Sequence, residues 1–60
     1  MVTWRVRIYN KIFLKRLIQD YLVQYDASYT AKDVEDEARH KYCLEHHSSG
    51  SNIEISVTKA

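Results

Sequence analysis

The chain has 60 residues with a formal net charge of +1, 45% hydrophobic residues and a single cysteine. Its length allows one small domain, its apolar content excludes intrinsic disorder, and its balanced charge disfavours a dedicated nucleic-acid binder. The lone cysteine excludes an internal disulfide. We therefore expect a single α+β domain that spans residues 1–60.

Two features bear on the compartment. The longest apolar run, Ile12–Leu14, is far shorter than the roughly 20 residues of a membrane span, and the N-terminus has no apolar signal-peptide region. A single unpaired thiol, at Cys43, is typical of a reducing environment. These features predict a cytoplasmic protein without a membrane partner.

The first expected element is a strand over residues 2–9. Apolar side chains alternate there with polar ones, which is the period of a strand with one buried face. The apolar set is Val2, Trp4, Val6 and Ile8. Arg5 and Arg7 fall on the opposite face, and Asn10-Lys11 predicts a turn.

Residues 11–29 support two interpretations. In the first, residues 20–29 form a strand, because tyrosine, valine and alanine side chains occupy every second position. Residues 11–19 are then a turn, an extended arm or a short helical excursion. In the second, apolar residues at spacings of three and four form one helix over residues 10–25, which gives a β-α-α-β order. We favour the strand, because two strands alone rarely form a stable sheet.

A helix is expected over residues 31–46. Thr30 and Asp33 have the spacing of a capping box, and acidic residues crowd the first turns, where the helix dipole favours them. Ala31, Val34, Ala38 and Tyr42 share one side and supply a narrow apolar stripe. A stripe this narrow suits a helix that lies flat on a sheet.

The last expected element is a strand over residues 52–58, in which apolar and polar side chains again alternate. It follows a loop over residues 48–52, where Gly50 is expected to supply a positive φ. The sequence therefore predicts an α+β fold of β-β-α-β order. Its sheet has three antiparallel or mixed strands and carries one main helix on one face.

Charge is segregated along the chain. Residues 1–19 contain five cations and no acid: Arg5, Arg7, Lys11, Lys15 and Arg16. Residues 20–37 contain six acids and one lysine. One interpretation is that the two halves pair with each other or face water, and the other is that each presents one sign to a partner. The basic set, with Trp4 and Tyr9 as stacking surfaces, defines an alternative function in nucleic-acid binding.

The expected helix also carries most of the side chains that could bind a metal. Asp36, His40, Cys43 and His47 follow one another at spacings of four, three and four. They extend over about 16 Å of helix, so they cannot all reach one ion. The usable ligand sets are His40, Cys43 and His47, or Cys43 with His46 and His47, and a further ligand would come from another chain. The simpler interpretation is a polar, solvent-facing side; a metal-stabilised homodimer is the alternative.

A strand that runs into a capped helix is indicated by Tyr21-x-Val23-x-Tyr25-x-Ala27, then Thr30-x-x-Asp33 and Glu37-Ala38. In this rhythm the chain resembles small phage-encoded β-β-α-β proteins, including short inhibitors of host RNA polymerase. The resemblance carries over no functional residue. It implies a small protein that acts by binding and blocking a larger one.

The leading expectation is a non-enzymatic protein-binding module, an inhibitor or adaptor, that needs no cofactor. Its candidate contacts are an exposed sheet edge or the acidic face of the helix, formed by Asp33, Asp36, Glu37 and His40. A homodimer is a further expectation, because association would bury apolar surface that one 60-residue chain cannot cover.

Overall fold

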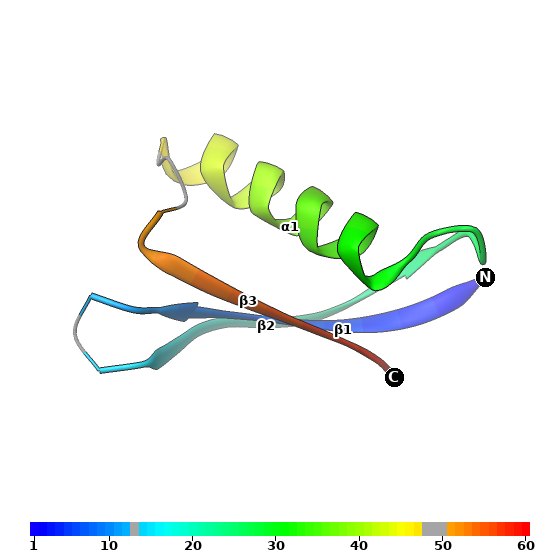
Figure 1. The fold of residues 1–60 in the computed structure, drawn as a ribbon, viewed down its shortest axis with the longest axis horizontal. Coiled ribbons are helices and arrows are strands. Elements are labelled where there is room, and N and C mark those ends of the chain that lie inside the picture. The colour runs from blue at the N-terminus through cyan, green and yellow to red at the C-terminus, as the bar shows by residue number, and fades with distance from the viewer. Residues whose placement is uncertain (13, 48–50) are drawn as a thin grey trace.

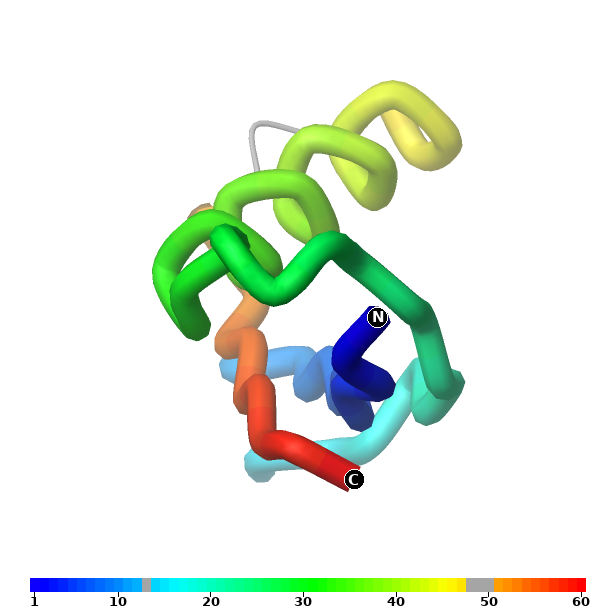
Figure 2. The backbone as a smooth tube through the Cα atoms, turned by 90° about the vertical axis from the view of Figure 1, so that its right-hand side faces the viewer, coloured from blue at the N-terminus to red at the C-terminus, as the bar shows by residue number. Residues whose placement is uncertain are grey.

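The computed structural model describes residues 1–12, 14–47 and 51–60, and its elements follow in β-β-α-β order. They are β1 (Val2–Asn10), β2 (Arg16–Tyr25), α1 (Ala31–His46) and β3 (Ile53–Lys59). The strands form one antiparallel sheet in the order β2-β1-β3, and α1 lies along one face of it (Figures 1 and 2). The predicted α+β fold is confirmed, with a fully antiparallel sheet.

The core lies between α1 and the helix-facing side of the sheet. Alternation along β1 directs every second side chain toward the helix, as the sequence pattern predicted. The buried side chains are Trp4, Val6 and Ile8 from β1, Val34 and Ala38 from α1, and Ile53 and Ile55 from β3. The two small helix residues let α1 approach the sheet closely, and its contacts run to β3 and β1. β2 lies at the margin of this layer, where its half-buried Tyr21, Val23 and Tyr25 pack against the core.

β2 begins earlier than the predicted strand over residues 20–29. Residues 16–19 continue the pairing with β1 past an irregularity at Ile8/Tyr9, where the register shifts by one residue. Such a bulge inserts one extra residue into a strand and lets the pairing continue beyond it. The alternative helix over residues 10–25, with its β-α-α-β order, is therefore wrong.

β2 also ends earlier than predicted, at Tyr25. The Asp26 carboxylate accepts a hydrogen bond from the backbone N–H of Ser28 at 2.8 Å, and the Asp26 carbonyl accepts one from the N–H of Tyr29 at 3.0 Å. Aspartate side chains commonly stabilise turns in this way. Ala27 and Tyr29 therefore continue the alternating sequence pattern, but they lie outside the strand.

The start of α1 agrees with the prediction. The Thr30 hydroxyl accepts the backbone N–H of Asp33 at 3.2 Å, and the Asp33 carboxylate accepts the N–H of Thr30 at 2.9 Å. This reciprocal pair is a complete capping box. The helix ends where His47 takes a left-handed conformation with φ 51° and donates its N–H to the carbonyl of Cys43.

The loop predicted over residues 48–52 includes Gly50, whose predicted positive φ lies outside the described residues. β3 follows it from Ile53, one residue later than predicted. Within the described part of the chain, no helix has the length and apolar content needed to cross a membrane.

Candidate functional site

The outer edge of β2 is the least covered part of the sheet. β2 pairs with β1 on one side, and no other described strand pairs with it. It is ten residues long, and the packing of α1 over β3 and β1 leaves it at the margin of the fold (Figure 2). A long edge strand offers a row of backbone donors and acceptors to another chain.

The direction of the β2 backbone groups follows from two hydrogen bonds on the other side of β1. Ala60 donates its N–H to the Thr3 carbonyl, and Lys11 donates to the Asn52 carbonyl, each at 3.0 Å. The odd-numbered residues of β1 therefore bond toward β3. Alternate residues of an antiparallel strand bond to opposite neighbours, so the even-numbered residues of β1 bond toward β2.

The alternation of hydrogen-bonding direction also applies to β2. The even-numbered residues of β1 pair with odd-numbered residues of β2, for example Val6 with Tyr21. The backbone groups of Asp20, Leu22 and Gln24 must then point away from β1, toward the outer edge. These three residues define the outer edge of β2.

Apolar side chains accompany this edge. Leu22 is 62% exposed, and Leu17 and Ile18 are also exposed. Leu22 lies opposite Arg5 on the face of the sheet that α1 does not cover. Single exposed apolar residues are ordinary, but these three belong to one edge strand, where they add apolar area to the outward backbone groups.

On the helix-facing side, β2 presents half-buried aromatic side chains. The rings of Tyr25 and Tyr29 stack at 4.5 Å between centroids, and Lys41 Nζ lies 5.1 Å from the centroid of Tyr21. Burial raises the pKa of Tyr21 above its ordinary value, with Tyr25 and Glu45 adding to the effect. Rigid rings of this kind contribute large contact area at protein interfaces.

The uncovered face of the sheet holds an ion cluster next to the same strand. Arg5 donates two hydrogen bonds to Asp20, from Nε at 3.0 Å and from Nη2 at 3.1 Å, while Arg7 Nε lies 3.7 Å from the same carboxylate. The hydrogen bond from Arg5 lowers the pKa of Asp20 below its usual range. Both predicted nucleic-acid contacts on β1 are therefore paired with an acid of β2.

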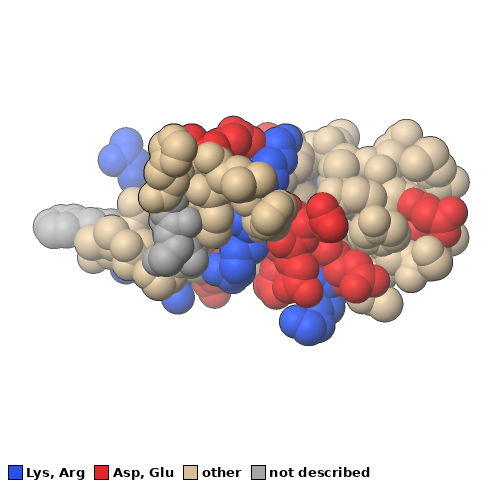
Figure 3. Space-filling view, turned by 90° about the horizontal axis from the view of Figure 1, so that it is seen from above, with Lys and Arg blue, Asp and Glu red and all other residues tan. Residues whose placement is uncertain are grey.

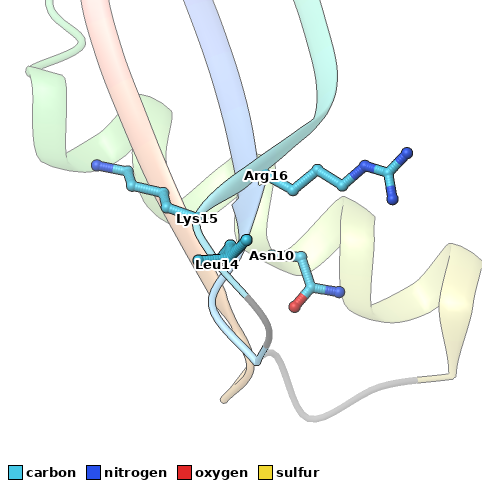
Figure 4. Close-up of a pocket in the computed structure, with 4 residues that line it drawn as sticks. All are labelled: Asn10, Leu14, Lys15 and Arg16. Carbon is cyan, nitrogen blue, oxygen red and sulfur yellow. The ribbon is translucent and has the colours of Figure 1, made fainter.

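The other predicted basic residues lie at the end of the β1–β2 hairpin. Lys15 pairs with Glu54 at 2.9 Å and lies 4.8 Å from the centroid of the Tyr9 ring, while Lys15 and Arg16 extend to opposite sides of the hairpin (Figure 4). Lys11 is exposed and also acts on the charge of Glu54, whose pKa is lowered mainly by Lys15. The five cations therefore do not form one continuous basic surface.

A pocket of about 610 Å³ is lined at this hairpin end by Asn10, Leu14, Lys15 and Arg16. Leu14 is 85% exposed and has a left-handed φ of 56°. Because Leu14 is so exposed, the pocket is an open depression in the surface (Figure 4). Its four described lining residues are an amide, an exposed leucine and two cations, so they include no acid that could pair with a base.

The predicted acidic face of α1 is partly engaged within the helix and its cap. Asp33 closes the capping box, and Asp36 lies 3.7 Å from Lys32 one turn earlier. Glu37 raises the pKa of Tyr25 after the larger effect of burial, which places it toward β2. His40 is exposed. Figure 3 accordingly shows acidic side chains with lysine and arginine beside them on this side of the molecule.

The histidines and the cysteine of α1 do not converge. Among residues 1–12, 14–47 and 51–60, no group of three His, Cys, Asp or Glu side chains is placed to hold a metal ion. The His46 ring stacks on Tyr42 at 4.2 Å, and His47 caps the helix, while Cys43 is half-buried. His40, Cys43 and His47, which the spacing allowed as one ligand set, are therefore not brought together among the described residues.

The residues of the outer edge, Asp20, Leu22 and Gln24, were not singled out by the sequence pattern. A usable signal was present, because Leu22 is the apolar residue that interrupts the alternation from Asp20 to Gln24. The edge itself depends on strand order, which periodicity does not contain. Comparison of the chain with protein-family models, with curated proteins and with solved structures gave no match.

Proposed function

We propose that the protein is a non-enzymatic binding module that pairs the outer edge of β2 with an extended strand of another polypeptide. The observation that carries the proposal is the edge itself. It combines ten residues of strand, backbone groups of Asp20, Leu22 and Gln24 directed outward, and an exposed leucine at its centre. Strand addition uses main-chain hydrogen bonds for affinity and side chains of the edge for specificity.

Other surfaces support binding less well. The cations needed for nucleic-acid binding are divided between Asp20, Glu54 and the hairpin end, and the acids of α1 are partly engaged by Thr30 and Lys32. An inhibitor or adaptor role in the cytoplasm accords with the resemblance to short phage inhibitors and with the free thiol of Cys43. These finer assignments belong to the same proposal.

The test replaces Gln24 by proline. This substitution removes one outward N–H, which the pairing with β1 does not use, so the fold should be retained. Wild-type and Gln24→Pro proteins are used to capture partners from a native lysate of the source cells. Each captured protein is identified, purified and titrated against both forms. We expect at least a tenfold weaker affinity for Gln24→Pro, because one of the outer-edge hydrogen bonds is lost and the proline ring disturbs the pairing beside it.

The matched control is Lys59→Pro. Because even-numbered residues of β3 bond toward β1, Lys59 directs its N–H outward on the opposite edge of the sheet. We expect partner affinity to be unchanged in Lys59→Pro and in the double charge reversal Asp36→Lys with Glu37→Lys. Loss of binding in the charge reversal, with Gln24→Pro binding normally, would instead locate the function on α1.

A further inference from the structure

We propose that β2 pairs with β2 of a second copy of the chain, antiparallel and centred on Leu22. The inference rests on the proposed function of the outer edge and names its partner. The result is a two-fold dimer with one continuous six-stranded sheet. Each copy contributes the same strand, so the contact closes on itself and leaves no further β2 edge exposed.

The direction of the backbone groups restricts the registers that such a dimer can use. Asp20, Leu22 and Gln24 offer outward groups, and strands that continue one sheet must place matching faces together. A two-fold axis perpendicular to the sheet satisfies both conditions. The axis then passes between two copies of one residue, and the candidates near the middle of the strand are residues 20 to 23.

Side-chain chemistry distinguishes these registers. An axis at Asp20 places two carboxylates directly opposite each other. An axis at Val23 places Leu22 opposite Gln24 of the second copy and leaves Asp20 beyond the end of the partner strand. Like charges opposite each other destabilise strand pairing. An axis at Tyr21 leaves the carboxylate of Asp20 opposite Leu22. Each of these three arrangements sets like charges together or sets Leu22 against a charged or polar side chain.

The axis at Leu22 gives matched pairs from Asp20 to Gln24. The two Leu22 side chains lie opposite each other on the uncovered face, with Asp20 opposite Gln24 on either side of them. On the helix-facing side, Tyr21 lies opposite Val23, so half-buried apolar groups meet. The strand is therefore self-complementary in both polarity and charge about this one residue.

The helices leave room for this arrangement. The perpendicular axis places both helices on the same side of the joined sheet, and each packs over β3 and β1 of its own copy. Strand spacings of about 4.8 Å separate the two β1 strands by about 14 Å, which exceeds the roughly 8–10 Å between packed helices. Tyr21, Val23 and Tyr25 of the two copies then form the sheet surface between the helices.

A crosslinking experiment tests the register in a Cys43→Ser background. A hydrogen-bonded antiparallel pair has Cα atoms about 5.5 Å apart, so Leu22→Cys should join two copies through a short thiol crosslinker. Gln24→Cys is the matched control on the same face of the same strand. Its two copies are displaced by four residues, about 14 Å, and should stay unlinked. Equal linking at both positions, or linking at Tyr21→Cys in preference to Leu22→Cys, would overturn the register.

Sedimentation equilibrium tests the dimer without crosslinking. The mass should rise with concentration from 7.1 kDa to twice that value. Leu22→Lys and Leu22→Glu should each remain monomeric at concentrations where wild type is dimeric, and an equimolar mixture should recover the dimer. Recovery shows that each variant is folded and that residue 22 faces itself.

The outcomes separate the inference from the proposed function. A wild-type protein that stays at 7.1 kDa up to millimolar concentration, while Gln24→Pro still weakens capture of a different protein, overturns the second-copy inference alone. A monomer with partner binding indifferent to Gln24→Pro overturns both. Dimerisation that survives in Leu22→Lys also contradicts the inference, because like charges would face each other at the axis.

Discussion

Arg5 of β1 and Asp20 of β2 form a bidentate ion pair, with Arg5 Nε 3.0 Å from Oδ1 and Nη2 3.1 Å from Oδ2 of Asp20. The pair is diagonal, because Asp20 lies directly opposite Arg7 in the register. It fixes the side chain of an outer-edge residue on the uncovered face. The same residue keeps its backbone groups directed outward, so the pair stiffens the edge without blocking it.

The Arg5–Asp20 pair predicts a component of acid sensitivity. Since the pKa of Asp20 is lowered in the folded protein, its contribution to stability is present above the ordinary carboxyl pKa. That contribution is lost as pH falls through the lowered value. We expect the melting temperature of wild type to fall more between pH 7 and pH 2 than that of Asp20→Asn. Parallel curves for the two proteins would contradict the assignment.

The core predicts a sharp contrast between two apolar residues of the sheet. Ile8 is fully buried, so Ile8→Ala should lower the free energy of unfolding by about 2–5 kcal/mol. Leu22 is mostly exposed, and Leu22→Ala should change it by no more than about 0.5 kcal/mol at dilutions where the protein is monomeric. Urea unfolding followed by the fluorescence of buried Trp4 measures both. A large loss for Leu22→Ala would show that its side chain packs within the monomer.

The capping box predicts that two substitutions are coupled. Thr30→Ala should lower the free energy of unfolding by about 1 kcal/mol, because one backbone N–H of the first turn loses its partner. Asp33→Ala removes the reciprocal bond to the N–H of Thr30. The double variant should lose less than the sum of the two single losses. Strict additivity in chemical denaturation would mean that the two bonds act independently.

The arrangement of His40, Cys43 and His47 predicts indifference to metal removal. No three of the potential ligands converge among the described residues, so bound metal should not contribute to folding. A chelator should leave the melting temperature unchanged, and added zinc should not raise it. A chelator-induced drop that zinc reverses would restore the metal-stabilised homodimer as an explanation.

Much of this fold was predictable because its elements have simple periods. The alternation in residues 2–9 and 52–58 and the Thr30–Asp33 cap each depend on local spacing, and each agrees with the structure in type and nearly in bounds. Of the predicted helix stripe, Val34 and Ala38 are buried, whereas Ala31 is exposed and Tyr42 is half-buried. Local patterns of this kind predict the elements correctly because the sheet and the helix bury the same faces that the periods define.

The errors lie in β2, where local pattern and long-range pairing disagree. Tyr21, Val23 and Tyr25 alternate as predicted, but the alternation continues in sequence to Tyr29, after Asp26 has already closed the strand with a turn. At the other end, the mixed apolar stretch before Asp20 becomes strand because β1 pairs with it across a bulge. The position of β2 at the edge depends on strand order, which only the three-dimensional arrangement defines.

Hydrogen exchange at individual amides of β2 reports whether the outer edge of this strand is free or paired. In the free monomer, the amides of Asp20, Leu22 and Gln24 should exchange rapidly, while those of Tyr21 and Val23, bonded to β1, should be protected. On binding of a captured partner, or at concentrations that favour the dimer, the three outward amides should slow by at least tenfold while the two inward amides stay protected. Binding that leaves the outward amides exchanging as fast as in the monomer would contradict the account.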